Sequence, residues 1–325
     1  MIVVTGGAGF IGSALVWQLN RLGEKDILVV DAGAPHSPKW RNLSRLDFDS
    51  YTEAESFVDR LEQGHYGDRI RAILHMGACS DTTERGVAYL RQNNTLYTQR
   101  LAVWAAARGA YFAYASSAAV YGDGRLGYSD SDRLTPLLEP LNPYGRSKLD
   151  FDAWAVASGL ASQITGFRFF NVYGPNEYHK GHMRSLAHKG FEQVLATGKL
   201  RLFKSHRPDY ADGEQKRDFL YLKDAVDAVI WFYRNPHWKG IFNLGTGRAQ
   251  MWNDLGAALF KALDRPVEIE YIEMPEDIRD QYQYFTEADM SKFRWTGCPV
   301  AFRDLDAGVT DYVRNYLATP DPYLG

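Results

Sequence analysis

The chain has 325 residues, a formal net charge of -3 at pH 7 and two cysteines. This length exceeds one ordinary α/β domain and predicts a large core with a second lobe attached to it. The small net charge gives no overall attraction to nucleic acid or to an anionic membrane, and Cys79 and Cys298 are too few for a disulfide framework and lack a metal-ligand spacing.

The sequence also lacks the usual signals of secretion and membrane insertion. No basic segment precedes an apolar segment at the start, no apolar run approaches ~18 residues, and residue 1 leads directly into a strand-like run. We therefore expect a cytoplasmic protein that binds no nucleic acid, no membrane and no metal.

The first element is an apolar strand at 2–5 that runs into the glycine turn GGAGFIG. Gly6, Gly9 and Gly12 have the spacing that lets the backbone turn tightly, approach a pyrophosphate and pack the next helix against the strand. That helix begins near Phe10 and directs its free N–H groups at the diphosphate. The turn therefore predicts a dinucleotide site, although a glycine turn that only joins a strand to a helix is the alternative.

A second strand-like run at 27–31 ends in Asp31, where a carboxylate is expected to meet the adenosine ribose. Three further runs follow, at 72–76, 111–116 and 164–169, with amphipathic stretches between them. This alternation predicts an α/β fold with a doubly wound, parallel Rossmann sheet and ligands at the carboxyl ends of its strands.

After about residue 170 the predicted loops are longer, and charged residues become more frequent in them. We expect a dinucleotide-binding Rossmann domain over 1–170, rejoined by about 218–250. The segments 171–217 and about 251–325 are then expected to form a smaller C-terminal substrate-binding lobe.

Tyr144 and Lys148 lie four residues apart at the start of a predicted helix, so their side chains share one face. A fixed ammonium beside a phenol favours the phenolate, which makes proton removal from an alcohol feasible near neutral pH. The run at 111–116 leads into Ser117 at the carboxyl edge of the predicted sheet, where a hydroxyl can orient a substrate oxygen. A serine-rich turn beside a surface Tyr/Lys pair is the alternative.

These features together resemble the extended short-chain dehydrogenase/reductase superfamily, in its sugar-nucleotide epimerase and dehydratase branch. Four segments are similar to one family within it, the ADP-L-glycero-D-manno-heptose 6-epimerases of lipopolysaccharide inner-core biosynthesis. They are HMGACSDTTE at 75–84, FAYASSAAVYG at 112–122, GFRFFNVYGPNEYHKGHM at 166–183 and FNLGTGRA at 242–249.

The resemblance implies a role for each matching position. It implies NADP binding at the glycine turn and at Phe10, Ile11, Asp31, Ala32, Lys39, Met76, Gly77, Ala78, Cys79, Ser80, Asn93, Tyr144, Lys148 and Lys180. It implies catalysis by Tyr144 and Lys180, assisted by Ser117 and Lys148, and substrate binding at Ser117, Asn171, His182, Lys189, Phe203, Lys204, Ser205, His206, Arg217 and Tyr282. The chain departs from the family at His182, usually a small hydroxyl residue, at Lys189, usually histidine, and in a longer loop at 207–216.

The chemistry gives Lys180 a separate reason to be catalytic. An epimerase that passes through a ketone needs proton transfer on both faces of one carbon, which two acid/base groups achieve more easily than one. Lys180 follows a strand end and lies between His179 and His182, so we expect neighbouring positive charge to lower its pKa. A solvent-exposed loop lysine is the alternative.

The form of the cofactor depends on two residues. The Asp31 carboxylate favours the ribose hydroxyls of NAD, whereas Lys39, eight residues later, can offset its repulsion of a 2′-phosphate. The resemblance favours NADP, with NAD possible. In the loop at 204–217 we expect basic side chains to bind the substrate diphosphate, and Arg217 is the best candidate because guanidinium groups match phosphate oxygens.

We therefore predict an isomerase: an NADP-dependent epimerase that acts at C6″ of ADP-glycero-manno-heptose by oxidation to a ketone and re-reduction, within a homo-oligomer. A UDP-hexose 4-epimerase is the close alternative. A dehydratase is disfavoured because Ala118 follows Ser117 where that branch usually carries a carboxylate. A dinucleotide-sensing scaffold is the alternative from outside the enzymes, and it has no use for a phenolate.

Overall fold

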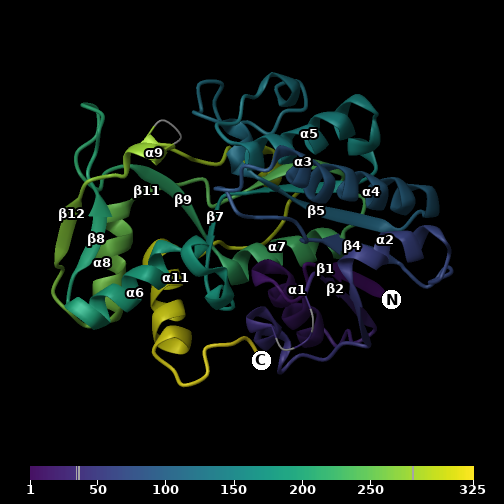
Figure 1. The fold of residues 1–325 in the computed structure, drawn as a ribbon, viewed down its shortest axis with the longest axis horizontal. Helices are drawn as coiled ribbons and strands as arrows, with labels where there is room; N and C mark the ends of the chain where they lie inside the picture. Colours follow the sequence, from purple (N-terminus) through teal and green to yellow (C-terminus); the bar gives the residue numbers. More distant parts are fainter. Residues whose placement is uncertain (34, 36, 280–281) are drawn as a thin grey trace.

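The computed structural model describes residues 1–33, 35, 37–279 and 282–325, and a seven-stranded parallel sheet forms its larger lobe (Figure 1). Every neighbouring pair of strands in this sheet is parallel. In spatial order the strands are β3 (Ser50–Glu53), β2 (Ile27–Asp31), β1 (Ile2–Thr5), β4 (Ala72–His75), β5 (Tyr111–Ser117), β6 (Thr165–Phe169) and β10 (Gly240–Leu244). This order confirms the predicted doubly wound Rossmann fold. The sequence analysis missed the edge strand β3, because this strand is polar and contains no apolar run.

Helices cover both faces of the sheet, as Figure 1 shows. One core lies between the sheet and α1 (Phe10–Arg21) and α7 (Leu222–Arg234), and the other lies beneath α2 (Ala54–Glu62), α4 (Tyr97–Arg108) and α5 (Pro143–Ala157). Within β1, Ile2 and Val4 face the first core while Val3 faces the second. Burial on both faces explains why these strands are continuously apolar.

The smaller lobe contains two further sheets and its own core. One sheet joins β7 (Asn171–Tyr173), β9 (Lys216–Tyr221) and β11 (Ala249–Met251), and the other pairs β8 (Leu200–Phe203) with β12 (Ile269–Ile272). The helices are α6 (Leu186–Thr197), α8 (Trp252–Ala262) and α11 (Leu305–Tyr312), with short helices α3 (Val87–Leu90), α9 (Glu276–Arg279) and α10 (Ser291–Trp295) elsewhere in the chain. Within the described ranges, no helix is long and apolar enough to cross a membrane.

The chain crosses between the lobes more than once. After β9 it returns through α7, which packs against α1, and through β10, which pairs with β6 at the edge of the large sheet.

Helix α5 begins where the sequence has Asn142 and Pro143, because the Asn142 side chain accepts a hydrogen bond from the backbone N–H of Gly145 at 2.7 Å and Pro143 occupies the first turn.

A fully buried ion pair joins α5 to the sheet. Arg168 of β6 donates its Nε–H to Asp152 of α5 at 2.9 Å, and both side chains are completely buried. The same carboxylate accepts the hydroxyls of Tyr114 and Ser116, both on β5 and both at 2.9 Å. The ion pair therefore fixes β5, β6 and α5 relative to one another.

We expect Asp152→Ala to lower the free energy of unfolding by about 3–5 kcal/mol, because it leaves the Arg168 charge buried without its partner. Asp150 on the same helix is a matched control: its ion pair with Arg146 is partly exposed, and Asp150→Ala should cost about 0.3–0.5 kcal/mol. Denaturant unfolding of both variants measures the difference, and equal losses would contradict a special role for the buried pair.

Candidate active site

A cavity of about 730 Å³ lies at the carboxyl ends of the central strands and extends into the smaller lobe. This is where ligands of doubly wound sheets bind. The predicted site residues that line it are Phe10, Ile11, Met76, Ala78, Ser80, Ser117, Tyr144, Lys148, Asn171, Lys180, His182, Lys189, Phe203 and Tyr282. Other predicted positions lie outside the lining: Gly6, Gly9, Gly12, Asp31, Ala32, Lys39, Gly77, Cys79, Asn93, Lys204, Ser205, His206 and Arg217.

The glycine turn has the shape of a dinucleotide cradle. Gly6 adopts φ +63°, and a Cβ on Gly12 would lie 2.0 Å from the Gly6 carbonyl oxygen, so both positions need glycine. Helix α1 begins after Gly9 without a side-chain cap, which leaves its first N–H groups available to an anion. The local geometry therefore fits a pyrophosphate.

Asp31 is fixed at the end of β2 by three donors. Its carboxylate accepts the backbone N–H groups of Ala8 at 2.8 Å and Ala32 at 2.7 Å, and Lys39 Nζ lies 2.6 Å from Oδ1. Lys39 therefore forms a close ion pair with the Asp31 carboxylate, and the Lys39 side chain is one-quarter exposed. This contact places a positive charge beside the carboxylate at the end of β2.

The loop after β4 is held by Asn94, which the sequence analysis missed. The Asn94 side chain accepts the backbone N–H of Cys79 at 2.8 Å and donates to the Cys79 carbonyl at 3.0 Å. Its neighbour Asn93 instead donates to the carbonyl of Tyr89 at 2.9 Å. Two adjacent asparagines were visible in the sequence, but only the helical phase decides which of them faces the loop.

Tyr144, Lys148 and Ser117 come together where α5 passes the end of β5. Lys148 Nζ donates to the carbonyl of Ala115 at 2.7 Å, and burial lowers the pKa of Lys148 to about 8. Burial also raises the pKa of Tyr144, an effect that hydrogen bonding with Ser117 opposes. Burial therefore dominates the pKa of Tyr144, and the Lys148 ammonium bonds to a carbonyl, so the expectation that Lys148 favours the phenolate stays a prediction.

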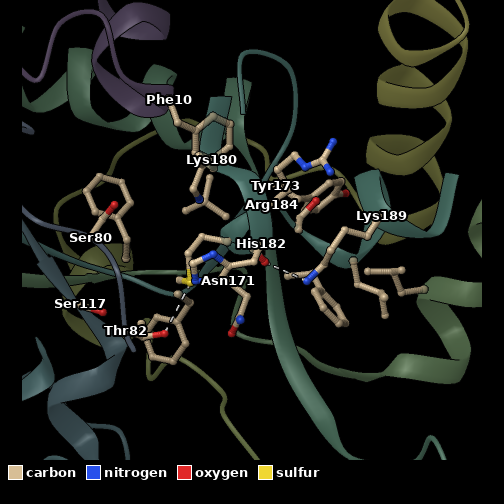
Figure 2. Close-up of a pocket in the computed structure, with 18 of the residues that line it drawn as sticks. Phe10, Ser80, Thr82, Ser117, Asn171, Tyr173, Lys180, His182, Arg184 and Lys189 are labelled. Atoms are coloured by element: carbon tan, nitrogen blue, oxygen red, sulfur yellow. Dashed lines mark hydrogen bonds between the residues drawn. The ribbon is translucent and has the colours of Figure 1, made fainter. Parts of the chain in front are cut away.

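Lys180 reaches the same cavity from the other lobe. It lies in the 3₁₀ turn Tyr178–Met183, and its Nζ is 4.8 Å from the ring centroid of Phe10. Figure 2 shows these two side chains next to each other. Its pKa is lowered, as expected, but chiefly by burial; Glu177 opposes the shift and Lys189 adds to it.

The flanking histidines are not the cause that the sequence suggested. Burial lowers the pKa of His179 to about 4, so this side chain is neutral near pH 7. His182 is exposed, with its Nε2 atom 3.6 Å from Asp81. The expected source of positive charge is therefore corrected from the histidines to Lys189, acting in addition to burial.

Some of the predicted substrate residues line the cavity, and others lie outside its lining. Lys189 donates from Nζ to the His182 carbonyl at 3.2 Å, and Figure 2 shows this contact on the far side of the view from Ser117. Farther along the chain, only Phe203 of the segment 203–206 lines the cavity. The Lys204 side chain instead pairs with Glu273 at 2.7 Å.

Arg217 lies behind the cavity wall. Its guanidinium carbon is 5.0 Å from the ring centroid of Tyr282 and 5.6 Å from that of Trp252, and both rings line the cavity. The Trp252 indole donates to the Tyr282 hydroxyl at 2.8 Å. Trp252 was missed by the sequence analysis, because a tryptophan at the start of a helix gives no signal of its own.

Comparisons with known proteins show which family the chain resembles. Residues 2–245 match the model of the NAD dependent epimerase/dehydratase family. The ADP-L-glycero-D-manno-heptose-6-epimerase of Nitratidesulfovibrio vulgaris strain DP4 is 52% identical over 324 residues, covering 100% of both chains.

Two solved structures extend the likeness to three dimensions. The crystal structure of Helicobacter pylori ADP-L-glycero-D-manno-heptose-6-epimerase has a TM-score of 0.79 and 26% identity, covering 97% of this chain and 95% of that one. MoeE5 in complex with UDP-glucuronic acid and NAD has a TM-score of 0.72 and 26% identity, covering 97% and 99%.

The fold, the family model and the curated relatives define an enzyme of the isomerase class, an epimerase of the short-chain dehydrogenase/reductase type. The chain belongs to the NAD dependent epimerase/dehydratase family, and within it to the family of ADP-L-glycero-D-manno-heptose-6-epimerases. The resemblance inferred from the sequence motifs is confirmed.

Proposed function

We propose that this enzyme epimerises ADP-glycero-manno-heptose at C6″, through a ketone, in the cytoplasmic synthesis of the lipopolysaccharide inner core. The observation that supports this proposal is that two side chains able to transfer a proton, Tyr144 and Lys180, lie on the wall of one cavity. They come from α5 of the large lobe and from the turn after β7 in the small lobe. Two such groups achieve inversion at a single carbon more easily than one group does.

In the proposed reaction, one group removes the hydroxyl proton from C6″ and the other returns a proton to the oxygen after the keto sugar has turned over. A bound nicotinamide supplies the acceptor and then the donor of the hydride. Ser117 orients the substrate oxygen near Tyr144, while Lys148 supplies a fixed positive charge beneath the site. General acid/base groups of this kind contribute roughly 10²- to 10⁴-fold to a rate.

We assign the cofactor as NADP, with NAD as the alternative. The residues present fit a nicotinamide dinucleotide, because the glycine cradle and the uncapped start of α1 suit a pyrophosphate. The ion pair between Lys39 and Asp31 supports the 2′-phosphate, since the lysine offsets the carboxylate charge. The family description and the NAD in the MoeE5 complex support the dinucleotide class.

For the substrate, the names of the relatives and the aromatic end of the cavity support an ADP-linked sugar. Phe203, Trp252 and Tyr282 line the end that lies in the small lobe, and flat rings of this kind suit a nucleobase. Arg217 lies directly behind two of these rings and is the candidate contact for the diphosphate. We also propose that the enzyme works as a homo-oligomer.

The first prediction concerns the substrate. Purified enzyme incubated with ADP-glycero-manno-heptose should interconvert the two C6″ epimers, and it should leave UDP-galactose unchanged over the same period. Analysis of the sugar stereochemistry by NMR or by chromatography measures both reactions. Turnover of UDP-galactose alone would favour the hexose 4-epimerase, which is the second candidate.

The second prediction concerns the cofactor. Lys39→Ala should weaken NADP binding about 10- to 100-fold while changing NAD binding little, because only NADP carries the 2′-phosphate and the Asp31 charge is left uncompensated. Lys25→Ala is a matched control, since Lys25 is an exposed lysine paired with Asp47. Titration of the cofactor-free protein with each dinucleotide measures the affinities, and equal losses for NADP and NAD would remove Lys39 from this role.

The third prediction separates the two bases. Tyr144→Phe and Lys180→Met should each reduce net epimerisation by roughly 10²-fold or more while retaining bound cofactor. In single turnovers, each variant should still reduce the cofactor with one epimer and fail with the other, and the two variants should show opposite preferences. Nicotinamide absorbance reports this step.

Near-normal epimerisation by Lys180→Met would refute the two-base mechanism. Lys180 would then be an ordinary loop lysine, and the case for the hexose 4-epimerase would strengthen. Near-normal epimerisation by Tyr144→Phe would show that another group moves the proton on that face.

A further inference from the structure

A buried carboxylate lies directly before the turn that carries Lys180. Glu177 is 0% exposed, and its two oxygens accept the backbone N–H of Ser185 at 2.5 Å and the Ser185 hydroxyl at 2.6 Å. Ser185 in turn caps α6, where its hydroxyl oxygen accepts the N–H of His188 at 3.3 Å. Glu177 therefore connects the Lys180 turn to the start of the helix that carries Lys189.

The residue before it connects the same turn to the cofactor cradle. Asn176 is fully buried and has a left-handed φ of 72°, and its side chain donates to the hydroxyl of Ser13 on α1 at 2.9 Å. The Asn42 side chain donates both to the Asn176 carbonyl at 3.1 Å and to the carbonyl of Ala8 in the glycine turn at 2.9 Å. The base of the Lys180 turn is therefore fixed against the glycine turn, and Glu177 is fixed with it.

Glu177 is also the negative charge that acts on both cavity lysines. Its own carbonyl accepts the backbone N–H of Lys180 at 3.0 Å, and its charge opposes the lowering of the pKa of Lys180 and of Lys189. Arg184, which lies just before α6, pairs with Glu192 instead. The charge of Glu177 adds to burial in raising the pKa of Tyr312 on α11 and of Tyr178. The titratable and charged groups around Lys180 are Glu177 and His179 on its own turn, Lys189 and Arg184 at the start of α6, His182, and Tyr144 and Lys148 across the cavity.

We propose that Glu177 is a positioning residue for the second acid/base group. It holds the Lys180 turn against α6 through Ser185, and its negative charge keeps the Lys180 amine able to carry a proton in a buried setting. This inference rests on the proposed catalytic role of Lys180. Glu177 itself does not line the cavity, so it acts through Lys180 and not on the substrate.

The test removes the charge of Glu177 and measures the pH at which the Lys180 amine loses its proton. In Glu177→Gln the side chain keeps its size but loses its charge, so the amine of Lys180 should lose its proton more readily. Competitive acetylation across a pH series, quantified by peptide mass spectrometry, gives the midpoint at which Lys180 becomes reactive. We expect this midpoint to fall by about 0.5–1 pH unit, while the exposed Lys199 stays unchanged.

Three comparisons separate charge from structure. Glu177→Asp keeps the charge but shortens the reach to Ser185, so kcat should fall while the midpoint stays near that of the wild type. Asp224→Asn removes another buried carboxylate, one that is bonded to Arg303, and should leave the midpoint in place. The limb of the pH–rate profile that reports Lys180 should move to lower pH in Glu177→Gln, which a purely structural loss would not produce.

An unchanged Lys180 midpoint in a folded Glu177→Gln protein overturns this inference. The outcome differs from failure of the two-base mechanism, which is decided by the activity of Lys180→Met and not by acetylation. Should Glu177→Gln fail to fold, Ser185→Ala replaces it, because that change withdraws one donor and keeps the charge. A reduced kcat with an unshifted midpoint then supports the positioning role, and a wild-type kcat overturns it.

Discussion

The buried ion pair between Asp152 and Arg168 is the interaction on which the geometry of the active site depends. It lies one helical turn beyond Lys148 on α5, and its carboxylate also accepts the hydroxyl of Ser116, the residue before Ser117. The strand end that supplies the serine and the helix that supplies the tyrosine and lysine are thus fixed by one charged group. Both side chains are completely buried, so removal of either one leaves the other as a buried charge without a partner, which is strongly destabilising.

Burial also governs the pKa values of the titratable side chains in the cavity. Burial raises the pKa of Tyr144, whereas it lowers the pKa of Lys148 to about 8 and also lowers that of Lys180, so the proton affinities of the phenol and the two amines move apart. The lowered pKa values bring the two amines nearer to neutral pH, where a general acid or base transfers protons most efficiently. Ser117 and Glu177 then adjust Tyr144 and Lys180 individually.

The end of the cavity in the smaller lobe is formed by packing more than by charge. Several basic residues of the segment 204–217 are occupied elsewhere, as the ion pairs of Lys204 with Glu273 and Arg207 with Asp209 illustrate. Aromatic side chains form this wall instead, with Arg217 behind them. A charged loop in a sequence is therefore a weak guide to a phosphate site, because its side chains can neutralise one another.

The sequence alone determined the parallel Rossmann sheet, the glycine turn and the Tyr144–Lys148 pair, because strand periodicity, glycine spacing and helical spacing are local. It also carried the motifs that identify the family. Only the tertiary structure decided which side chains share the cavity: that Lys180 lies against Phe10, that Asn94 supports the loop after β4, and that Glu177 is buried beneath the turn. Those outcomes depend on contacts between segments distant in the chain and on burial, which sets the pKa values, and neither can be read from local spacing.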